Sequence, residues 1–168
     1  MIQRLSNILI TLTLASVSLT SWALPDDSEQ EIRIASDSAS LDKIRGEIIC
    51  SGNVNMQQGS LNIQAQTLTL IRTTKGLQKI IATGTPARYE QTLSANEGKT
   101  LAYGETIIYD TNIEELTLLN NAGLEKQGNV FSGEKIVYLI KEQRVKAESP
   151  EQQNRIRMVI QPKKDKES

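Results

Sequence analysis

Along most of the chain, apolar and polar side chains alternate with a period of two residues. The alternation is clearest at residues 61–65, 68–70 and 116–118, and residues 32–34, 136–140 and 156–160 are also short and rich in β-branched side chains. Such segments, bounded by Gly, Asn, Ser or Asp, are typical of strands. No long run has apolar residues at i, i+3, i+4 and i+7, the spacing of an amphipathic helix. The pattern predicts an all-β protein.

One motif occurs four times, at residues 34–41, 63–70, 102–109 and 131–138. In each copy a small residue precedes a polar residue and then an apolar–x–apolar pair; the small residues are Ser36, Ala65, Gly104 and Gly133. A second element, rich in Gly and Asn, lies between the copies at 51–54, 83–87 and 120–122.

A small residue followed by a change in the parity of the apolar positions suits a corner, where a strand bends from one sheet to another. Stacking several bent units gives two facing sheets whose inward side chains share one apolar seam. The repeats leave open whether that seam is a filled core or an open groove.

The first 23 residues have the pattern of a signal peptide. Arg4 is the positive residue, residues 8–15 are the apolar region, and Ser21-Trp22-Ala23 is the small-x-small cleavage site. An uncleaved anchor is the alternative, but Ser and Thr interrupt a stretch that would need about 20 mostly apolar residues to span a membrane. We expect cleavage after Ala23, export to the periplasm, one domain at 24–160 and a flexible charged tail at 161–168.

The composition excludes several classes of function. The formal net charge of −1 offers no basic surface for nucleic acid. The chain has no histidine, so a Ser-His-Asp triad, a Cys-His pair and a histidine metal site are excluded. Residues 96–100 end like a phosphate-binding loop, but Leu93 stands where that motif requires glycine. Cys50, the single cysteine, is expected to be a buried apolar residue. We predict no enzyme activity, cofactor or metal.

Residues 32–37, 52–65 and 133–139 resemble the LptA (OstA-like) family of lipopolysaccharide-transport proteins, and the resemblance extends from about 31 to 160. It implies a twisted, slightly open β-jellyroll of two facing antiparallel sheets, whose apolar groove holds the acyl chains of lipopolysaccharide. Members of this family bridge the inner-membrane LptB, LptC, LptF and LptG complex and the outer-membrane LptD and LptE translocon.

The apolar members of the alternating segments are expected to point inward, because alternate residues share one face of a sheet. As lipid-binding residues we predict Ile32, Ile34, Ile63, Leu68, Leu70, Tyr89, Ile107, Tyr109, Leu118, Ile136 and Tyr138. The resemblance places Ile32, Tyr89 and Tyr109 where the family contacts lipid.

Both ends of the sheet stack are predicted to receive partner strands. The N-terminal edge contains Ile32, Arg33 and Ile34, and the C-terminal edge contains Ile156, Arg157, Met158, Val159 and Ile160. Because neither edge is strongly blocked by charge or proline, a strand of another chain can add to it. The resemblance implies LptC at the N-terminal edge and LptD at the C-terminal edge, and self-association would join the two edges head to tail.

Two alternative functions remain open. The first is an envelope scaffold protein of the same fold that carries no lipid. The second is an LptC-like subunit that keeps residues 1–23 as a membrane anchor.

Overall fold

The computed structural model describes residues 27–92, 98–149 and 155–162, which form one short 3-10 helix and ten strands. The elements are η1 (Asp27–Glu29), β1 (Arg33–Ala35), β2 (Ser38–Asp42), β3 (Glu47–Gln58), β4 (Leu61–Thr73), β5 (Gly76–Thr92), β6 (Lys99–Asp110), β7 (Glu115–Lys126), β8 (Asn129–Leu139), β9 (Arg144–Glu148) and β10 (Arg157–Val159). Within these ranges no helix is long and apolar enough to cross a membrane. The predicted signal peptide and most of the predicted tail lie outside the described residues.

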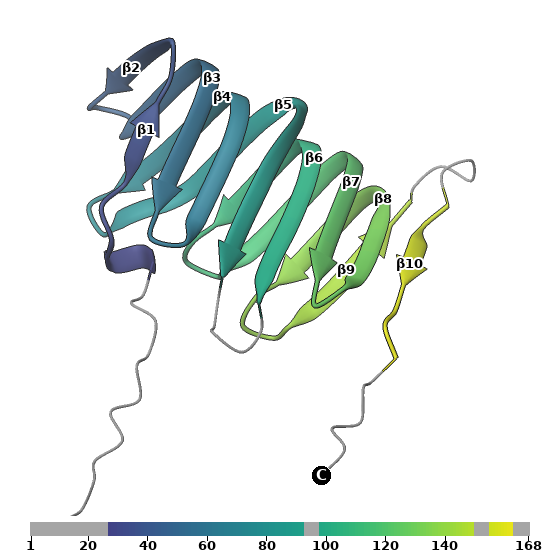
Figure 1. Ribbon diagram of the computed structural model, residues 1–168. Coiled ribbons are helices and arrows are strands. Elements are labelled where there is room, and N and C mark those ends of the chain that lie inside the picture. The colour runs from purple at the N-terminus through teal and green to yellow at the C-terminus, as the bar shows by residue number, and fades with distance from the viewer. Residues whose placement is uncertain (1–26, 93–97, 150–154, 163–168) are drawn as a thin grey trace, which may run out of the picture.

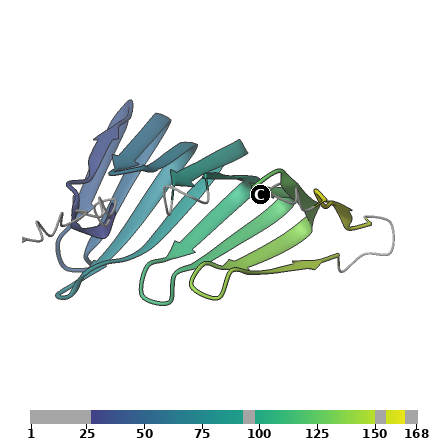
Figure 2. The same cartoon turned by 60° about the horizontal axis from the view of Figure 1, so that its bottom comes forward.

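All ten strands belong to one antiparallel sheet in which β3 to β8 pair in chain order. The long strands bend near their middles, so the sheet forms two layers (Figures 1 and 2). We call the layer with β1 and β10 the β1 half and the layer with β2 and β9 the β2 half. The two facing sheets predicted from the sequence are therefore the two halves of one continuous sheet, and the all-β expectation is confirmed.

The bends lie at the predicted corners. The pairing register shifts between Ser51 and Val54, and equivalent shifts interrupt the ladders at 64–67, 83–87, 103–106 and 119–122. The parity of the inward positions changes across the repeated motif: Ile63 is inward before the corner of β4, and Leu68 is inward after it. The small residues of the motif thus mark real bends.

Backbone conformation explains why Gly and Asn collect at the corners. Gly52 and Asn53 have φ values of +80° and +46°, and Asn120 and Asn121 have φ values of +60° and +51°. Glycine and, among the other residues, asparagine adopt this left-handed region most readily. Pro86 lies within the register shift of β5, where its missing N–H leaves no ladder hydrogen bond unmade.

The register lines the inward side chains up in rows across the strands. One row of the β2 half contains Ala39, Cys50, Leu68, Ala82, Ile107, Leu118, Ile136 and Ala147. The next row of that half contains Leu41, Ile48, Leu70, Ile80, Tyr109, Leu116, Tyr138 and Val145. A row of the β1 half contains Ile34, Met56, Ile63, Tyr89, Ala102, Leu124, Phe131 and Met158. Ala39, Leu41 and Met158, on the edge strands, are exposed. The other members of these rows form one apolar interior between the halves.

Both ends of the sheet have short edge strands. In the described part of the chain, β1 and β2 pair only with β3, and β9 and β10 pair only with β8. Figure 1 shows β1 and β2 at one end of the molecule and β9 and β10 at the other. The sheet is thus open at two edges, and the rows of the interior run from one edge to the other.

Candidate functional site

The predicted lipid-binding residues all belong to the apolar interior. Eight are buried, with 2% of their surface exposed or less: Ile63, Leu68, Leu70, Tyr89, Ile107, Leu118, Ile136 and Tyr138. Ile32, Ile34 and Tyr109 are partly buried and pack against this cluster. Their inward orientation is therefore as expected, whereas contact with lipid stays a prediction.

The interior also contains apolar residues that the alternating pattern did not single out. They include Cys50, Val54, Met56, Leu61, Ile80, Ala82, Ala87, Ala102, Leu116, Ala122, Leu124 and Ile140. Cys50 is buried and free, so its predicted role as a small apolar residue is confirmed. Three of these residues, Ile80, Ala82 and Ala87, lie on β5 with Tyr89. The alternating pattern does not predict them because Gly84 and Pro86 interrupt it on that strand.

The two halves of the sheet contact one another across the interior. Tyr89, from the β1 half, meets Tyr109, from the β2 half, in an edge-to-face arrangement with ring centroids 6.1 Å apart and an interplanar angle of 74°. Edge-to-face packing is a favoured geometry for aromatic pairs. The side chains of the two halves therefore pack together across the interior.

One margin of the interior is polar. We call it the polar lip; it is formed where β3, β5, β6 and β7 end or begin in the β1 half, by Gln58, Gln91, Thr100 and Lys126. Gln91 pairs with Thr100, and Thr100 pairs with Lys126, so these side chains stand side by side on adjacent strands. Gln58, Gln91 and Thr100 are buried and Lys126 is half-buried.

The helix η1 docks on the end of the polar lip nearest β3. The Asp27 carboxylate accepts hydrogen bonds from Ser60 N at 2.6 Å, Ser60 Oγ at 2.7 Å and Gln91 Nε2 at 2.7 Å. Gln58 Nε2 donates to the carbonyl oxygens of Ser28 and Gln30. These bonds hold the segment before β1 against the margin of the interior.

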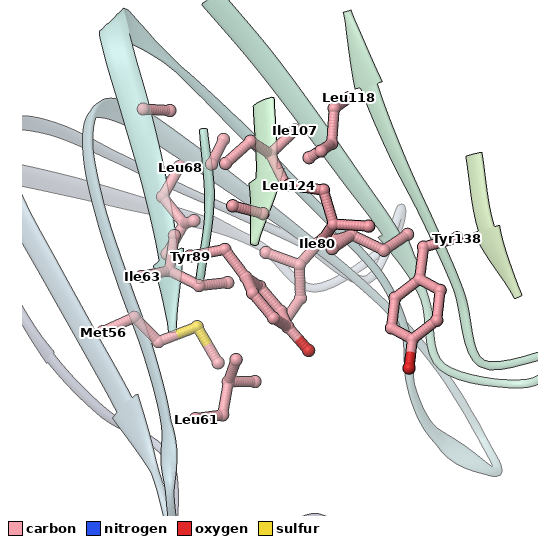
Figure 3. Packing of buried hydrophobic residues seen from close by; sticks show 14 of the residues in the cluster. Met56, Leu61, Ile63, Leu68, Ile80, Tyr89, Ile107, Leu118, Leu124 and Tyr138 are labelled. Atoms are coloured by element: carbon pink, nitrogen blue, oxygen red, sulfur yellow. The ribbon is translucent and has the colours of Figure 1, made fainter. Parts of the chain in front are cut away.

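Two tyrosines bring their hydroxyl groups to the polar lip. Figure 3 shows the hydroxyl ends of Tyr89 and Tyr138 pointing the same way, away from Ile107 and Leu118. The Tyr89 hydroxyl donates to Gln91 Oε1. Burial raises the pKa of Tyr89 well above its ordinary value of 10.0, and Tyr109, Tyr138 and Asp27 raise this pKa further. Tyr89 is therefore a neutral hydrogen-bond donor at any physiological pH.

A lysine links the two halves at the same margin. Lys126 Nζ, from the β1 half, donates a hydrogen bond of 2.7 Å to the hydroxyl of Tyr138, from the β2 half, and lies 5.3 Å from the centre of its ring. Beside it, Thr100 Oγ1 is buried and has no hydrogen-bond partner in the part of the chain that the structure describes. No sequence pattern singled out Thr100 or Lys126.

The C-terminal edge exposes the residues that were predicted to receive a partner. Ile156, Met158, Val159 and Ile160 are 40%, 62%, 55% and 62% exposed, and Arg157 is also exposed. At the N-terminal edge Arg33 is exposed, whereas Ile32 and Ile34 turn toward the interior. Their backbone stays at the sheet edge, so the two edges differ in the apolar surface that they offer.

Metal chemistry has no anchor in the described residues. Nowhere in these ranges do three or more Cys, Asp or Glu side chains gather so that they could hold a metal ion. Among the residues that the structure describes, the buried polar side chains are those of two glutamines and a threonine, and none of them is a carboxylate that could do acid–base chemistry.

Comparison with known proteins agrees with this fold. The model of the family "LptA/(LptD N-terminal domain) LPS transport protein" matches residues 33–144. The lipopolysaccharide export system protein LptH of Pseudomonas aeruginosa is 39% identical over 160 residues, which cover 91% of each chain. LptA of Haemophilus influenzae is 34% identical over 146 residues (84% of each chain), and LptA of Escherichia coli K12 is 29% identical over 158 residues (93% of this chain, 84% of the relative).

A solved structure gives the same result in three dimensions. The crystal structure of LptH, described as the LptA homologous periplasmic component of the lipopolysaccharide transport device of Pseudomonas aeruginosa, superposes with a TM-score of 0.74 at 38% identity. The match covers 82% of this chain and 100% of that one. This chain therefore belongs to the LptA/LptD N-terminal domain family of lipopolysaccharide transport proteins.

Proposed function

We propose that this protein is a periplasmic carrier that takes the acyl chains of lipopolysaccharide between the two halves of its sheet. The observation that carries the proposal is the continuous apolar interior, which runs through every long strand from one edge of the sheet to the other. Its relatives are transport proteins, which is a non-enzymatic role. We propose that this protein likewise catalyses no reaction.

The driving force is the removal of acyl chains from water, worth about 0.8 kcal/mol for each buried methylene group. The interior residues pack on one another without a guest, so part of this free energy is used to separate the halves. The corners, with Gly52, Asn53, Asn120 and Asn121 in the left-handed region, are the places where the angle between the halves can change. The sugar head stays in water at the margin.

Transport across the periplasm needs neighbours at both ends. The edges at β1 and β2 and at β9 and β10 supply unpaired strand backbone, and strand addition would extend the apolar rows into the next molecule. We propose that LptC adds at the N-terminal edge, LptD at the C-terminal edge, and further copies of this chain head to tail between them. Such a contact joins unlike surfaces, so it builds open filaments.

The test is site-specific photo-crosslinking in cells that make lipopolysaccharide. A crosslinker placed at Ile32, Tyr89 or Tyr109 is expected to capture lipopolysaccharide, because these side chains face the interior. The matched controls are Arg33, on β1, and Thr69, on β4, whose side chains point away from the interior. Equal capture at both sets would contradict the assignment. An envelope scaffold without cargo would give no capture at any position.

A further inference from the structure

An isoleucine projects into water from the turn between β2 and β3. Ile44 is 99% exposed, and the chain places Lys43 and Arg45 on either side of it. Asp42 Oδ1 fixes the turn by accepting hydrogen bonds from the backbone N–H groups of Ile44 at 2.9 Å and Arg45 at 3.0 Å. Turns are usually built from Gly, Asn, Asp, Ser or Pro, so this turn does not need an isoleucine.

The turn between β4 and β5 lies beside this one. The N–H group of Arg72 donates a hydrogen bond of 2.8 Å to the carbonyl oxygen of Gly46. Gly46 has a φ of +66°, and a Cβ atom there would lie 2.3 Å from the carbonyl oxygen of Arg72, so the two backbones meet closely. We call residues 41–45 and 72–75 the basic tip. They lie at the N-terminal edge of the β2 half, at the opposite end of the molecule from β9 and β10 (Figure 1).

Aliphatic and cationic side chains share one hollow in the basic tip. Its volume is about 530 Å³, and its lining includes Leu41, Lys43, Ile44, Arg45 and Arg72. Leu41 is 58% exposed, so two large aliphatic side chains meet water here among three cations. Neighbouring exposed apolar side chains with a polar rim are typical of an interaction surface.

The positive charge of the basic tip is only partly neutralised. Arg45 lies 3.8 Å from Asp42, but Lys43, Arg72 and Lys75 form no ion pair within the described ranges. With Glu47 counted beside it, the tip has two carboxylates against four cations, a formal charge of +2, whereas the whole chain carries −1. The basic tip is therefore a local positive surface on a chain of slightly negative net charge.

The other turns of this margin of the β2 half differ in charge. Ile113, between β6 and β7, is also exposed, at 58%, but it is followed by Glu114. Glu114 pairs with Lys141 at 3.1 Å, and Arg144, at the start of β9, pairs with Glu142 at 2.7 Å. An exposed isoleucine among unpaired cations is thus a property of the N-terminal end of this margin.

We propose that the basic tip docks on the anionic phospholipid surface of a membrane, with Lys43 and Arg72 at the lipid phosphates and Ile44 inserted beside the headgroups. Cations are attracted to an anionic leaflet, and an aliphatic side chain gains free energy when it leaves water. A bilayer is soft and accepts a projecting side chain, whereas a protein partner needs a pocket shaped for Ile44. This inference goes beyond the proposed carrier function, because a carrier needs no contact with phospholipid.

The test is co-sedimentation of the purified mature protein with lipid vesicles that contain no lipopolysaccharide. One set contains phosphatidylethanolamine and phosphatidylglycerol, and the other contains phosphatidylcholine alone. The wild-type protein is expected to sediment with the anionic vesicles and to stay in solution with the neutral ones. Salt at about 1 M, where the Debye length is about 3 Å, should release it.

Two variants of the basic tip separate its charge from its apolar side chain. Lys43→Ser should weaken binding to anionic vesicles about fivefold, the effect of one cation near such a surface. Ile44→Ser should weaken it about tenfold, since an aliphatic side chain no longer leaves water. The matched controls are Lys135→Ser, which removes an ion-paired lysine, and Ile113→Ser, which removes an exposed isoleucine from another turn. Both controls should bind as the wild type does.

The outcomes also distinguish this inference from the carrier function. A wild-type protein that binds neither kind of vesicle, or binds both equally, would overturn membrane docking. So would an Ile113→Ser protein that loses as much binding as Ile44→Ser. If the vesicles stay unbound while Ile44→Ser weakens binding to LptC, the basic tip is a protein interface and the membrane assignment is wrong. Each variant is also tested for a soluble complex with lipopolysaccharide: its absence in the wild type would contradict the carrier function alone, and Ile44→Ser should leave it intact.

Discussion

Replacement of Thr100 by valine is expected to stabilise the folded protein. Threonine and valine have nearly the same shape, so the substitution removes the hydroxyl and leaves the packing of β6 unchanged. The hydroxyl oxygen is buried and without a partner in the described residues. Burial of such a group costs about 1–3 kcal/mol, whereas an apolar group of the same shape carries no such cost.

We expect the free energy of unfolding of Thr100→Val to rise by about 1 kcal/mol, which raises Tm by roughly 3 °C in a domain of this size. The assay is urea unfolding followed by circular dichroism, with a thermal melt as a second measurement. Thr69→Val is the matched control, because Thr69 points outward from β4 and its replacement should change stability by less than about 0.5 kcal/mol. A Thr100→Val protein that is less stable than the wild type would show that the hydroxyl has a partner, and the reasoning from its burial would be refuted.

The remaining predictions concern the interior, the tyrosines and the C-terminal edge. Ile107→Ala should cost about 2–5 kcal/mol in urea unfolding because Ile107 is fully buried, while Ile108→Ala on the opposite face should cost much less; equal losses would contradict the register. Because the pKa of Tyr89 is raised in the folded state, its contribution to stability should be constant below pH 10 and be lost above it as the unfolded chain ionises. In urea unfolding above pH 10, the stability of Tyr89→Phe should therefore fall less steeply than that of the wild type; identical pH dependence would contradict the burial of this phenol. Deletion of residues 155–168 should abolish concentration-dependent oligomers in analytical ultracentrifugation. The monomer should stay folded and still bind LptC, because β10 pairs with only a short part of β8; unchanged oligomers would contradict end-to-end association.

The corners of the fold could be predicted from the sequence because they change a local pattern. The inward apolar positions of β4 are odd-numbered up to Ile63 and even-numbered from Leu68, and the strand bends between them, near Ala65. The same switch surrounds Gly104 and Gly133. On β5 the signal was hidden, since Gly84 and Pro86 read as a loop although they lie inside the longest strand.

The polar lip could not be predicted in this way. Thr100 and Lys126 lie at strand ends, where polar residues ordinarily face solvent, and Lys126 precedes the turn at Gln127 and Gly128. Their position depends on how far each strand extends beyond its corner. The nearness of Lys126 to Tyr138 depends on the folding of one half of the sheet over the other. Both are properties of the whole sheet and leave no local pattern in the sequence.

The central claim is that acyl chains enter between the two halves of the sheet, and the most direct measurement is whether the purified protein brings lipopolysaccharide into a soluble complex. Residues 24–168 are mixed with lipopolysaccharide and separated by size-exclusion chromatography, and each fraction is assayed for protein and for lipid. The account predicts that lipopolysaccharide leaves its large aggregates and elutes with the protein. Elution of all the lipid as aggregates, with folded protein in separate fractions, would contradict it.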